Sequence, residues 1–243
     1  MTRRWLITGA SRGIGAAIAA TAVERGDSVV LVARSEAVER VAADLSLRGP
    51  TAYAVRADLS SPDGPAEAVA AATEMLGGLD VLVNNAAIHR GGRIEKLPEG
   101  DFEAVIEANL IAPYRVCREA VKVMDEGSAI VNIGAVVGFR GFPGDAPYGS
   151  SKAGLAGLTL VLAIELARRK ITCNLVVPGF TETEMTGALD DRAREKIITR
   201  IPLRRPAEAS EVAAVVGWVS ASPYMTGAIV PVDGGLSAAL GGV

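Results

Sequence analysis

A tyrosine and a lysine four residues apart are spaced for acid–base chemistry. The sequence Tyr148-Gly-Ser-Ser-Lys152 follows a segment containing glycine and proline and continues into an apolar run from Ala153 to Ile164. This pattern predicts a helix that begins near Tyr148, with both side chains one turn apart on the same face. An ammonium so close lowers the pKa of a tyrosine, which would let Tyr148 donate and accept protons near neutral pH. The spacing alone also fits a surface tyrosine beside a solvated lysine, so the rest of the chain must decide.

A glycine-rich turn near the N-terminus has the pattern of a phosphate-binding loop. The first apolar run ends in Thr8-Gly-Ala-Ser-Arg-Gly-Ile-Gly15, and a helical stretch follows. Gly9 and Gly13 allow a tight turn and a close approach of the backbone to a diphosphate, and Gly15 allows the helix to pack on the strand. The helix N-terminus offers free N–H groups to the phosphates. Because the turn lies in a strand–helix–strand unit, it predicts a dinucleotide site.

The end of the second apolar run bears on which dinucleotide is bound. A site selective for NAD usually has an acidic residue here, which accepts a hydrogen bond from the ribose 2′-hydroxyl. This run instead ends in Val32-Ala-Arg-Ser35. Together with Arg12 in the glycine turn, Arg34 would bring a second guanidinium to a 2′-phosphate, which favours NADP(H). An ordinary surface charge at a helix start is the alternative for Arg34.

Short apolar runs alternate with stretches of helical composition along the whole chain. Near-continuous apolar runs are typical of strands buried in a parallel sheet, and this alternation predicts a doubly wound fold. We therefore expect an α/β protein, a Rossmann-type parallel sheet of about seven strands with helices on both faces, in a single domain over residues 1–243. The expected strands are Trp5–Ile7, Val29–Ala33, Ala52–Val55, Leu79–Val83, Ala129–Ile133, Ile171–Val177 and Ala228–Val232. The expected helices include Gly15–Arg25, Ser35–Leu47, Pro65–Leu76 and Phe102–Met124.

Composition limits the possible partners. The chain of 243 residues is 49% hydrophobic and carries a formal net charge of −3. It has no long basic block, so a nucleic-acid partner is not expected, and small molecules are. Cys117 and Cys173 have no metal-ligand spacing. They indicate buried thiols in a reducing compartment and no metal site.

The apolar run after Lys152 bears on location and assembly. No secretory leader pattern precedes the first strand and no apolar run reaches the ~20 residues that cross a bilayer, so we expect a cytoplasmic protein without a membrane partner. From Ala153 to Ile164 only Thr159 is polar. A helix that is apolar all round must be covered on more than its core side. Since this run is too short to span a membrane, it predicts an interface between subunits.

Polar residues lie where the predicted strands end. Asp58 follows the third strand, and Asn84–Ala87 close the fourth. Open α/β sheets bind ligands at these carboxyl ends. Asn109 lies mid-helix, where asparagine is a poor helix former, so a functional role, a kink or chance can explain it. His89, the only histidine, lies in a loop with no partner pattern, and we interpret it as a rim residue rather than a catalyst.

Together these motifs resemble the short-chain dehydrogenase/reductase family, and within it the 3-oxoacyl-[acyl-carrier-protein] reductase-like ketoreductases. The resemblance covers essentially the whole chain in the family's order. It rests on Thr8–Gly15, Asp58, Asn84–Ala87, Asn109, Tyr148-x-x-x-Lys152, Pro178-Gly-Phe-Thr-Glu-Thr183 and the late stretch Thr226-Gly227 to Asp233-Gly-Gly235. It implies an NADPH-dependent carbonyl reductase and a homotetramer.

The resemblance also implies a role for each motif. Tyr148 would deliver a proton to the substrate carbonyl oxygen while NADPH delivers hydride to the carbon. Lys152 would hold the nicotinamide ribose and lower the pKa of Tyr148, and Asn109 would hold a water that links Lys152 to solvent. The residues expected to contact the cofactor are Gly9, Ser11, Arg12, Gly13, Ile14, Gly15, Arg34, Asp58, Leu59, Asn85, Ala86, Ala87, Tyr148, Lys152, Pro178, Gly179, Thr181 and Thr183.

One position departs from the family pattern. After the fifth strand the family has a serine whose hydroxyl holds the substrate carbonyl, and this chain has Ala135 there, with no Ser or Thr from Ile133 to Pro147. Three accounts stay open: a deliberate Ser→Ala change that traps a ligand, a natural enzyme with another donor, or a protein that has lost catalysis. The last would leave an NADP-binding module that senses or scaffolds.

Two segments are expected to cover the site, because insertions near strand ends act as lids. They are Phe139–Pro143 and Thr186–Ile201, both partly apolar, which suits a hydrophobic ketone or an acyl thioester. In the resembling reductases, basic residues beside the entrance receive an acidic acyl carrier protein. One such patch is matched by Arg168, Arg169 and Lys170. A second is not, because the acidic residues Asp125-Glu126 lie where it would be.

Overall fold

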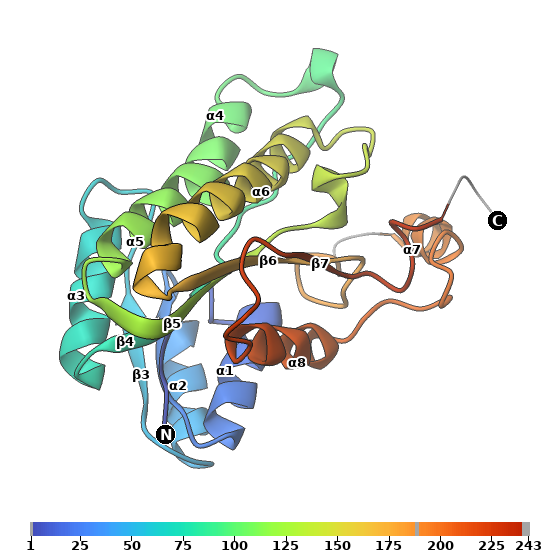
Figure 1. Cartoon of the computed structure of the whole chain (residues 1–243). Helices are drawn as coiled ribbons and strands as arrows, with labels where there is room; N and C mark the ends of the chain where they lie inside the picture. Colours follow the sequence, from blue (N-terminus) through green and yellow to red (C-terminus); the bar gives the residue numbers. More distant parts are fainter. Residues whose placement is uncertain (1, 188–189, 240–243) are drawn as a thin grey trace.

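The chain folds around one parallel β-sheet flanked by helices on both faces (Figure 1). A computed structural model describes residues 2–187 and 190–239. The seven strands lie in the order β3-β2-β1-β4-β5-β6-β7. Their bounds are β1 Arg4–Thr8, β2 Ser28–Ala33, β3 Ala52–Arg56, β4 Leu79–Asn84, β5 Met124–Ile133, β6 Thr172–Pro178 and β7 Ile229–Val232. All seven predicted strands are confirmed, because runs this apolar are stable only with both faces of the sheet covered.

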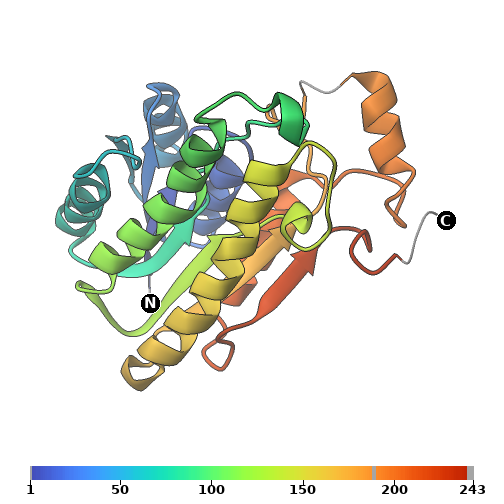
Figure 2. The ribbon, with the colours of Figure 1, turned by 90° about the horizontal axis from the view of Figure 1, so that it is seen from above.

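The helices form two layers that sandwich the sheet (Figures 1 and 2). On one face, α1 (Gly13–Glu24), α2 (Ala37–Ser46) and α8 (Ala209–Ser220) pack against side chains such as Ile7, Leu31 and Val176. On the other face, α3 (Gly64–Leu76), α5 (Ala112–Ala120) and α6 (Ala146–Leu166) pack against Leu6, Leu82 and Ile130. Neighbouring strand residues point to opposite faces, so each strand contributes to both layers.

The predicted helix over Phe102–Met124 is wrong in its extent. The structure divides it into α4 (Asp101–Ile106), a π-helical segment η2 (Glu107–Ile111) and α5, and Met124 already belongs to β5. Asn109 lies in the π segment, where one extra residue widens the turn. Asn109 therefore lies in an irregular part of the helix, which fits its low helix propensity.

Helix α6 is longer than the apolar run that predicted it. It begins at Ala146 with Pro147 in its first turn, two residues before Tyr148, and spans 21 residues. With the following 3-10 turn η4 (Ala167–Arg169) it is long and apolar enough to cross a membrane by length and composition alone. This is weak evidence, since a core helix of a soluble protein meets the same criterion, and α6 packs along β6 and α4. The expectation that this helix is too short to span a bilayer is therefore wrong, because the helix is longer than its apolar run.

The remaining short elements lie in the loops. They are η1 (Ile94–Lys96), η3 (Val136–Gly138) and α7 (Asp191–Ile198). The expected cover segment Thr186–Ile201 contains α7 and lies partly outside the described residues, since 188 and 189 are not described. Neither α7 nor α8 was predicted from the sequence.

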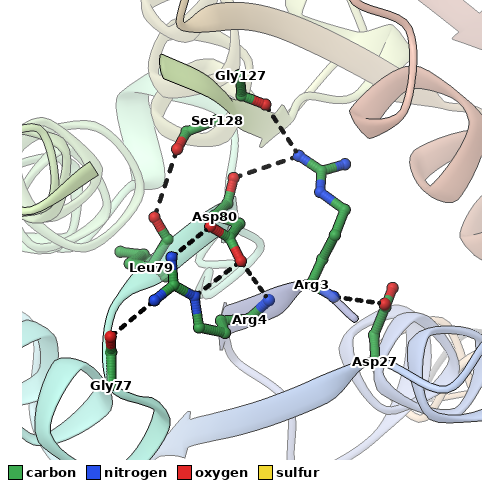
Figure 3. A network of polar contacts seen from close by, with 8 residues as sticks. All are labelled: Arg3, Arg4, Asp27, Gly77, Leu79, Asp80, Gly127 and Ser128. Atoms are coloured by element: carbon green, nitrogen blue, oxygen red, sulfur yellow. Dashed lines mark hydrogen bonds and ion pairs between the residues drawn. The ribbon is translucent and has the colours of Figure 1, made fainter. Parts of the chain in front are cut away.

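A polar network joins the amino ends of the central strands, at the edge of the sheet opposite the strand ends that carry the motifs (Figure 3). Arg4 donates to Asp80 from its backbone N (2.9 Å), Nε (2.8 Å) and Nη2 (2.6 Å). Arg3 reaches the carbonyl oxygens of Ser220 and Asp80 through its guanidinium, at 2.6 and 3.3 Å. Partial burial raises the pKa of Asp80, but the hydrogen bonds from Arg4 outweigh it and hold that pKa below its usual range. The network therefore ties β1, β4 and α8 together.

We predict that Asp80→Asn lowers the free energy of unfolding by about 1–3 kcal/mol at neutral pH, because Arg4 keeps its donors and loses the charged acceptor. The folded pKa of Asp80 lies below its unfolded value of about 4. Its contribution is therefore complete above that value and is lost as the pH falls through the folded pKa. Urea unfolding from pH 7 to pH 3 measures this, and the stability difference between the two proteins should narrow toward the acid end.

Glu126→Gln is the matched control. Glu126 pairs with Lys170 at the surface, and both side chains are about two-thirds exposed, so the change should stay within about 0.5 kcal/mol. An equal loss in both variants would contradict a special role for the Arg4–Asp80 bonds.

Candidate active site

A cleft of about 930 Å³ opens at the carboxyl ends of β1, β2, β4, β5 and β6. It includes the point between β1 and β4 where the strand order reverses, which is where open α/β sheets bind ligands. The cleft brings together all but two of the site residues expected from the sequence. Those that line it are Gly9, Ser11, Arg12, Gly13, Ile14, Arg34, Asp58, Leu59, Asn85, Ala86, Ala87, Ala135, Tyr148, Lys152, Pro178, Gly179, Thr181 and Thr183. Gly15 and Asn109 do not line it.

The glycine turn packs directly against the end of β4. A Cβ on Gly9, whose φ is +64°, would lie 2.6 Å from the Cα of Ala86. A Cβ on Gly15 would lie 2.4 Å from the carbonyl oxygen of Gly9 and 2.6 Å from Nδ2 of Asn85. Side chains larger than hydrogen would push α1 away from the strand ends. Gly15 therefore has the packing role that the sequence predicted.

Thr8 and Asn85 hold that turn in place. Thr8 Oγ1 accepts hydrogen bonds from the backbone N of Asn85 at 2.9 Å and of Ala86 at 3.1 Å. Asn85 Nδ2 donates back to the carbonyl oxygens of Thr8 and Gly9, both at 3.0 Å. The asparagine amide thus orients the glycine turn rather than pointing freely into the cleft.

The two arginines expected at a 2′-phosphate both line the cleft. Arg34 follows β2, and Arg12 lies in the glycine turn. Arg12 Nη1 pairs with Glu184 Oε2 at 2.7 Å, and both side chains are about two-thirds exposed. An exposed ion pair of this kind is weak, so an anion in the cleft can replace Glu184.

Lys152 is buried beneath Tyr148. Its Nζ donates to the carbonyl oxygen of Ile133 at 2.8 Å and lies 5.6 Å from the centroid of the Tyr148 ring. Burial lowers the pKa of Lys152 to about 8. The amine therefore faces the end of β5.

The predicted lowering of the Tyr148 pKa is wrong in this structure. Burial raises the pKa of Tyr148 to about 12, and the negative charge of Asp145 adds to the rise. A low-dielectric surrounding disfavours the phenolate, and the ammonium group of Lys152 is directed to a carbonyl instead. At neutral pH the tyrosine is protonated and able to donate.

Asn109 anchors the loop after β4 to helix α6. It is completely buried, its Oδ1 accepts from the backbone N of Ile88 at 2.8 Å, and its Nδ2 donates to Ile88 O at 2.9 Å. Nδ2 also donates to Ser151 Oγ at 3.2 Å, and Ser151 Oγ donates to the carbonyl oxygen of Tyr148 at 2.7 Å. The asparagine thereby fixes the first turn of α6 against the cleft.

Ala135 lies where the sequence places it, two residues after the end of β5, and lines the cleft with Gly134. Its backbone is extended, with φ −163° and ψ 150°. Ser151, the serine one residue before Lys152, uses its hydroxyl hydrogen on the Tyr148 carbonyl. The side chain at position 135 offers the cleft no hydrogen-bond donor.

His89 has a partner that the sequence analysis missed. Its Nε2 lies 2.8 Å from Asp145 Oδ1, and its ring meets the Tyr148 ring edge to face, with centroids 5.2 Å apart and planes at 68°. The hydrogen bond to Asp145 raises the pKa of His89 although burial opposes it. His89 is at the rim, as expected, with its side chain 41% exposed. The two partners are 56 residues apart, and no local pattern links them.

A second cavity of about 430 Å³ adjoins this pair. It is lined by the loop after β4 and the predicted cover segment, including Ile94, Val137, Phe142, Pro143 and Asp145. Phe139 and Phe142 are close to half exposed. Apolar groups that reach solvent beside the cleft are suited to a hydrophobic substrate.

Comparison with known proteins agrees with this geometry. A family model described as enoyl-(acyl carrier protein) reductase matches residues 9–237. The chain is 37% identical over 242 residues to the 3-oxoacyl-[acyl-carrier-protein] reductase FabG of Staphylococcus aureus (strain Mu50), covering 97% of this chain and 98% of the relative.

Solved structures are similar over the same length. A short-chain dehydrogenase from Burkholderia cenocepacia J2315 in complex with NADP superposes with a TM-score of 0.92 at 36% identity, over 96% of this chain and 97% of the other. A blue fluorescent protein from a metagenomic library in complex with NADPH superposes with a TM-score of 0.92 at 33% identity, over 97% and 98% of the two chains.

Proposed function

Since the chain belongs to the short-chain dehydrogenase/reductase family and is an NADP-dependent oxidoreductase, we propose that it reduces a ketone, with Tyr148 as the proton donor. The observation that carries the proposal is that one cleft holds both the glycine turn and the Tyr148–Lys152 pair. Binding and chemistry can therefore take place side by side.

The residues of the cleft fit NADP(H). Gly9 and Gly15 allow the turn to pack tightly against the end of β4, since a Cβ on either would collide with neighbouring atoms. Helix α1 begins at Gly13 with no side-chain cap. Its first N–H groups are thus available to a diphosphate. We assign Arg34 and Arg12 to the 2′-phosphate, Asp58 to the adenine, and Pro178–Thr183 to the nicotinamide carboxamide.

The protonated state of Tyr148 suits the reductive direction. When bound, NADPH supplies hydride to the carbonyl carbon. Tyr148 then donates its O–H proton to the carbonyl oxygen, and Lys152, with a pKa of about 8, restores the proton or holds the ribose. We assign Asn109 to holding a relay water, next to its bonds with Ile88 and Ser151.

The substrate class follows from the apolar cover. Phe142 and Pro143 beside the cleft support a hydrophobic ketone or an acyl thioester, and the names of the relatives support delivery by an acyl carrier protein. The basic patch first considered for that carrier lies in and after η4, at the far end of α6. At 1.5 Å per residue this is ~30 Å from Tyr148. Arg169 and Lys170 are also bonded within the chain, so within one subunit this patch is not beside the entrance.

Ala135 supports a second candidate function. Without a hydroxyl aimed at the carbonyl oxygen, the chain fits an NADP-binding module that senses or scaffolds without turnover. Cofactor binding does not separate the two functions, because the glycine turn and Lys152 do not depend on position 135. A panel of 3-oxoacyl thioesters and cyclic ketones incubated with NADPH does separate them.

We predict that Ala135→Ser raises kcat by about 10²–10³, the usual effect of one donor aimed at a developing oxyanion. This gain is expected if alanine replaces a serine in an otherwise intact site, as in a deliberate Ser→Ala change. Tyr148→Phe should abolish turnover in either background. Efficient reduction by the alanine form, unchanged by Ala135→Ser, would indicate another donor. If neither form reduces any ketone in the panel, the result would support the non-catalytic NADP-binding module.

We predict that Arg34→Asp weakens NADPH binding about tenfold to a hundredfold, since a charge-assisted contact to the 2′-phosphate is replaced by repulsion, and leaves NADH binding nearly unchanged. Arg40→Asp makes the same charge change on an exposed position of α2 outside the cleft lining and should leave both affinities alone. Fluorescence titration of both cofactors measures this. Equal losses for NADPH and NADH would contradict the assignment of Arg34.

We also propose that the chain forms one domain over residues 1–243 and a homotetramer in the cytoplasm. One stripe of α6 is exposed and apolar, with Leu160, Val161 and Ile164 at 46, 54 and 79% exposure. Isolated subunits rarely leave such a stripe in water. Cys117 and Cys173 are buried free thiols, as a reducing compartment allows.

Light scattering at micromolar concentration should give the mass of four chains, and Ile164→Glu should give a smaller species because it buries a charge in the contact. Leu47→Glu is the control, since Leu47 is 87% exposed at the end of α2 and lies off the stripe. A monomeric parent chain would refute the tetramer.

A further inference from the structure

The surroundings of Tyr148 contain a histidine–aspartate pair that the proposed reaction has not yet used. Asp145 immediately precedes α6 and is the residue at its N-cap, yet its side chain does not cap the helix. Its Oδ1 instead lies 2.8 Å from His89 Nε2. The His89 ring in turn packs edge to face on Tyr148. An aspartate at this position would normally accept from the backbone N–H groups of the helix, so the pairing with His89 takes its place.

The pair also joins the two loops that border the cleft. Beside it, the backbone N of Gly92 donates to the carbonyl oxygen of Gly144 at 2.8 Å. A Cβ on Gly91 would lie 3.2 Å from Cε1 of His89 and 2.8 Å from the Gly144 carbonyl oxygen. The backbone of Gly91 therefore packs closely beside the His89 ring, which is oriented by its contacts with Asp145 and Tyr148.

The other charged side chains near the His89–Asp145 pair have hydrogen-bonding partners of their own or line the adjoining cavity. Arg90, next to His89, pairs with Asp101 of α4 at 2.7 Å. Lys152, one turn beyond Tyr148 on α6, donates to Ile133. Arg93 and Glu95 line the adjoining cavity together with Asp145. The charge that acts on Tyr148 from this side is therefore that of Asp145, modified by the protonation of His89.

We propose that the His89–Asp145 pair is a charge-balancing and positioning element for Tyr148, in which a protonated His89 offsets Asp145 while the tyrosine gives up its proton. This inference rests on the proposed reduction of a ketone. In that step the Tyr148 O–H bond breaks, the proton joins the substrate oxygen and a phenolate remains. His89 keeps its proton and Asp145 stays a carboxylate, so the pair is neutral throughout.

The sign of the effect follows from the charges. The bond to Asp145 raises the pKa of His89 above 6.5, so below that pKa the pair carries no net charge. Above it, His89 is neutral, and the bare negative charge of Asp145 opposes formation of the phenolate. A charged His89 thus supports the phenolate that Tyr148 becomes when it gives up its proton.

The first test is the pH profile of kcat with NADPH and a reducible ketone. In the parent chain kcat should fall about tenfold as the pH rises through the pKa of His89, since one pKa unit on the donor corresponds to a tenfold change. His89→Gln keeps a hydrogen-bonding side chain but cannot be charged, so it should show the low rate at every pH. The step expected from Lys152 near its pKa of about 8 should persist in both proteins.

The second variant separates charge from packing. In His89→Gln/Asp145→Asn the pair is again neutral, so kcat should return to within about threefold of the rate of the parent chain at acid pH. The KM for NADPH should stay unchanged, because neither residue lines the glycine turn. A purely structural role predicts an additive loss in the double variant. That additive loss, or an unchanged pH step in His89→Gln, would overturn the proposal.

Two titrations do not depend on turnover. His89 is the only histidine, so its imidazole gives a single set of NMR signals, whose midpoint should lie above 6.5 and fall in Asp145→Asn. The ultraviolet absorbance of the phenolate, taken as the difference from Tyr148→Phe, should rise at lower pH in Asp145→Asn than in the parent. If both titrations behave so but no ketone is reduced, the proposed function fails and the charge coupling stands. Unshifted midpoints would refute the coupling itself.

Discussion

The close contact between the glycine turn and the end of β4 is the constraint on which the cleft depends. Gly15 brings α1 within van der Waals distance of Gly9 and Asn85, and any side chain there would collide with the backbone. The same contact fixes the start of the loop that carries Ile88 and His89. This one contact, where the strand order reverses between β1 and β4, therefore positions both the glycine turn and the loop beside Tyr148.

Buried side-chain hydrogen bonds connect the central strands to α6. Asn84 Nδ2 donates to Asn132 Oδ1 at 2.9 Å, and Asn132 Nδ2 donates to Thr159 Oγ1 at 2.9 Å. Each of these side chains is almost completely buried, where a lost hydrogen bond is costly. Together with the bonds of Asn109, they fix the positions of β4, β5 and α6 relative to one another. The first turn of α6, with Tyr148 and Lys152, is thereby held rigidly over the strand ends.

The electrostatics of Tyr148 are a balance of opposing effects. Burial and Asp145 both favour the neutral phenol, which keeps a proton available for donation but makes the resulting phenolate unfavourable. Lys152, whose Nζ lies 5.6 Å from the ring centroid, and a protonated His89 would both offset that cost. In the proposed reduction, a chain that lacks a hydroxyl at position 135 has fewer groups to stabilise the developing charge, so we expect such compensation to matter more.

The sequence by itself determined the layer architecture and the strands, and it located much of the cleft, partly through a family resemblance that supplied residues such as Pro178–Thr183. Apolar runs, glycine spacing and the residues at strand ends are local patterns, and local patterns fix which face of each element is buried. The helices α7 and α8 were missed, and the division of α4, η2 and α5 could only be suspected from Asn109, because their limits depend on packing against distant elements. Tertiary structure alone decided the direction of the Lys152 amine, the raised pKa of Tyr148 and the pairing of His89 with Asp145. Burial and charge act through space between residues far apart in the chain, so no spacing along the sequence encodes them.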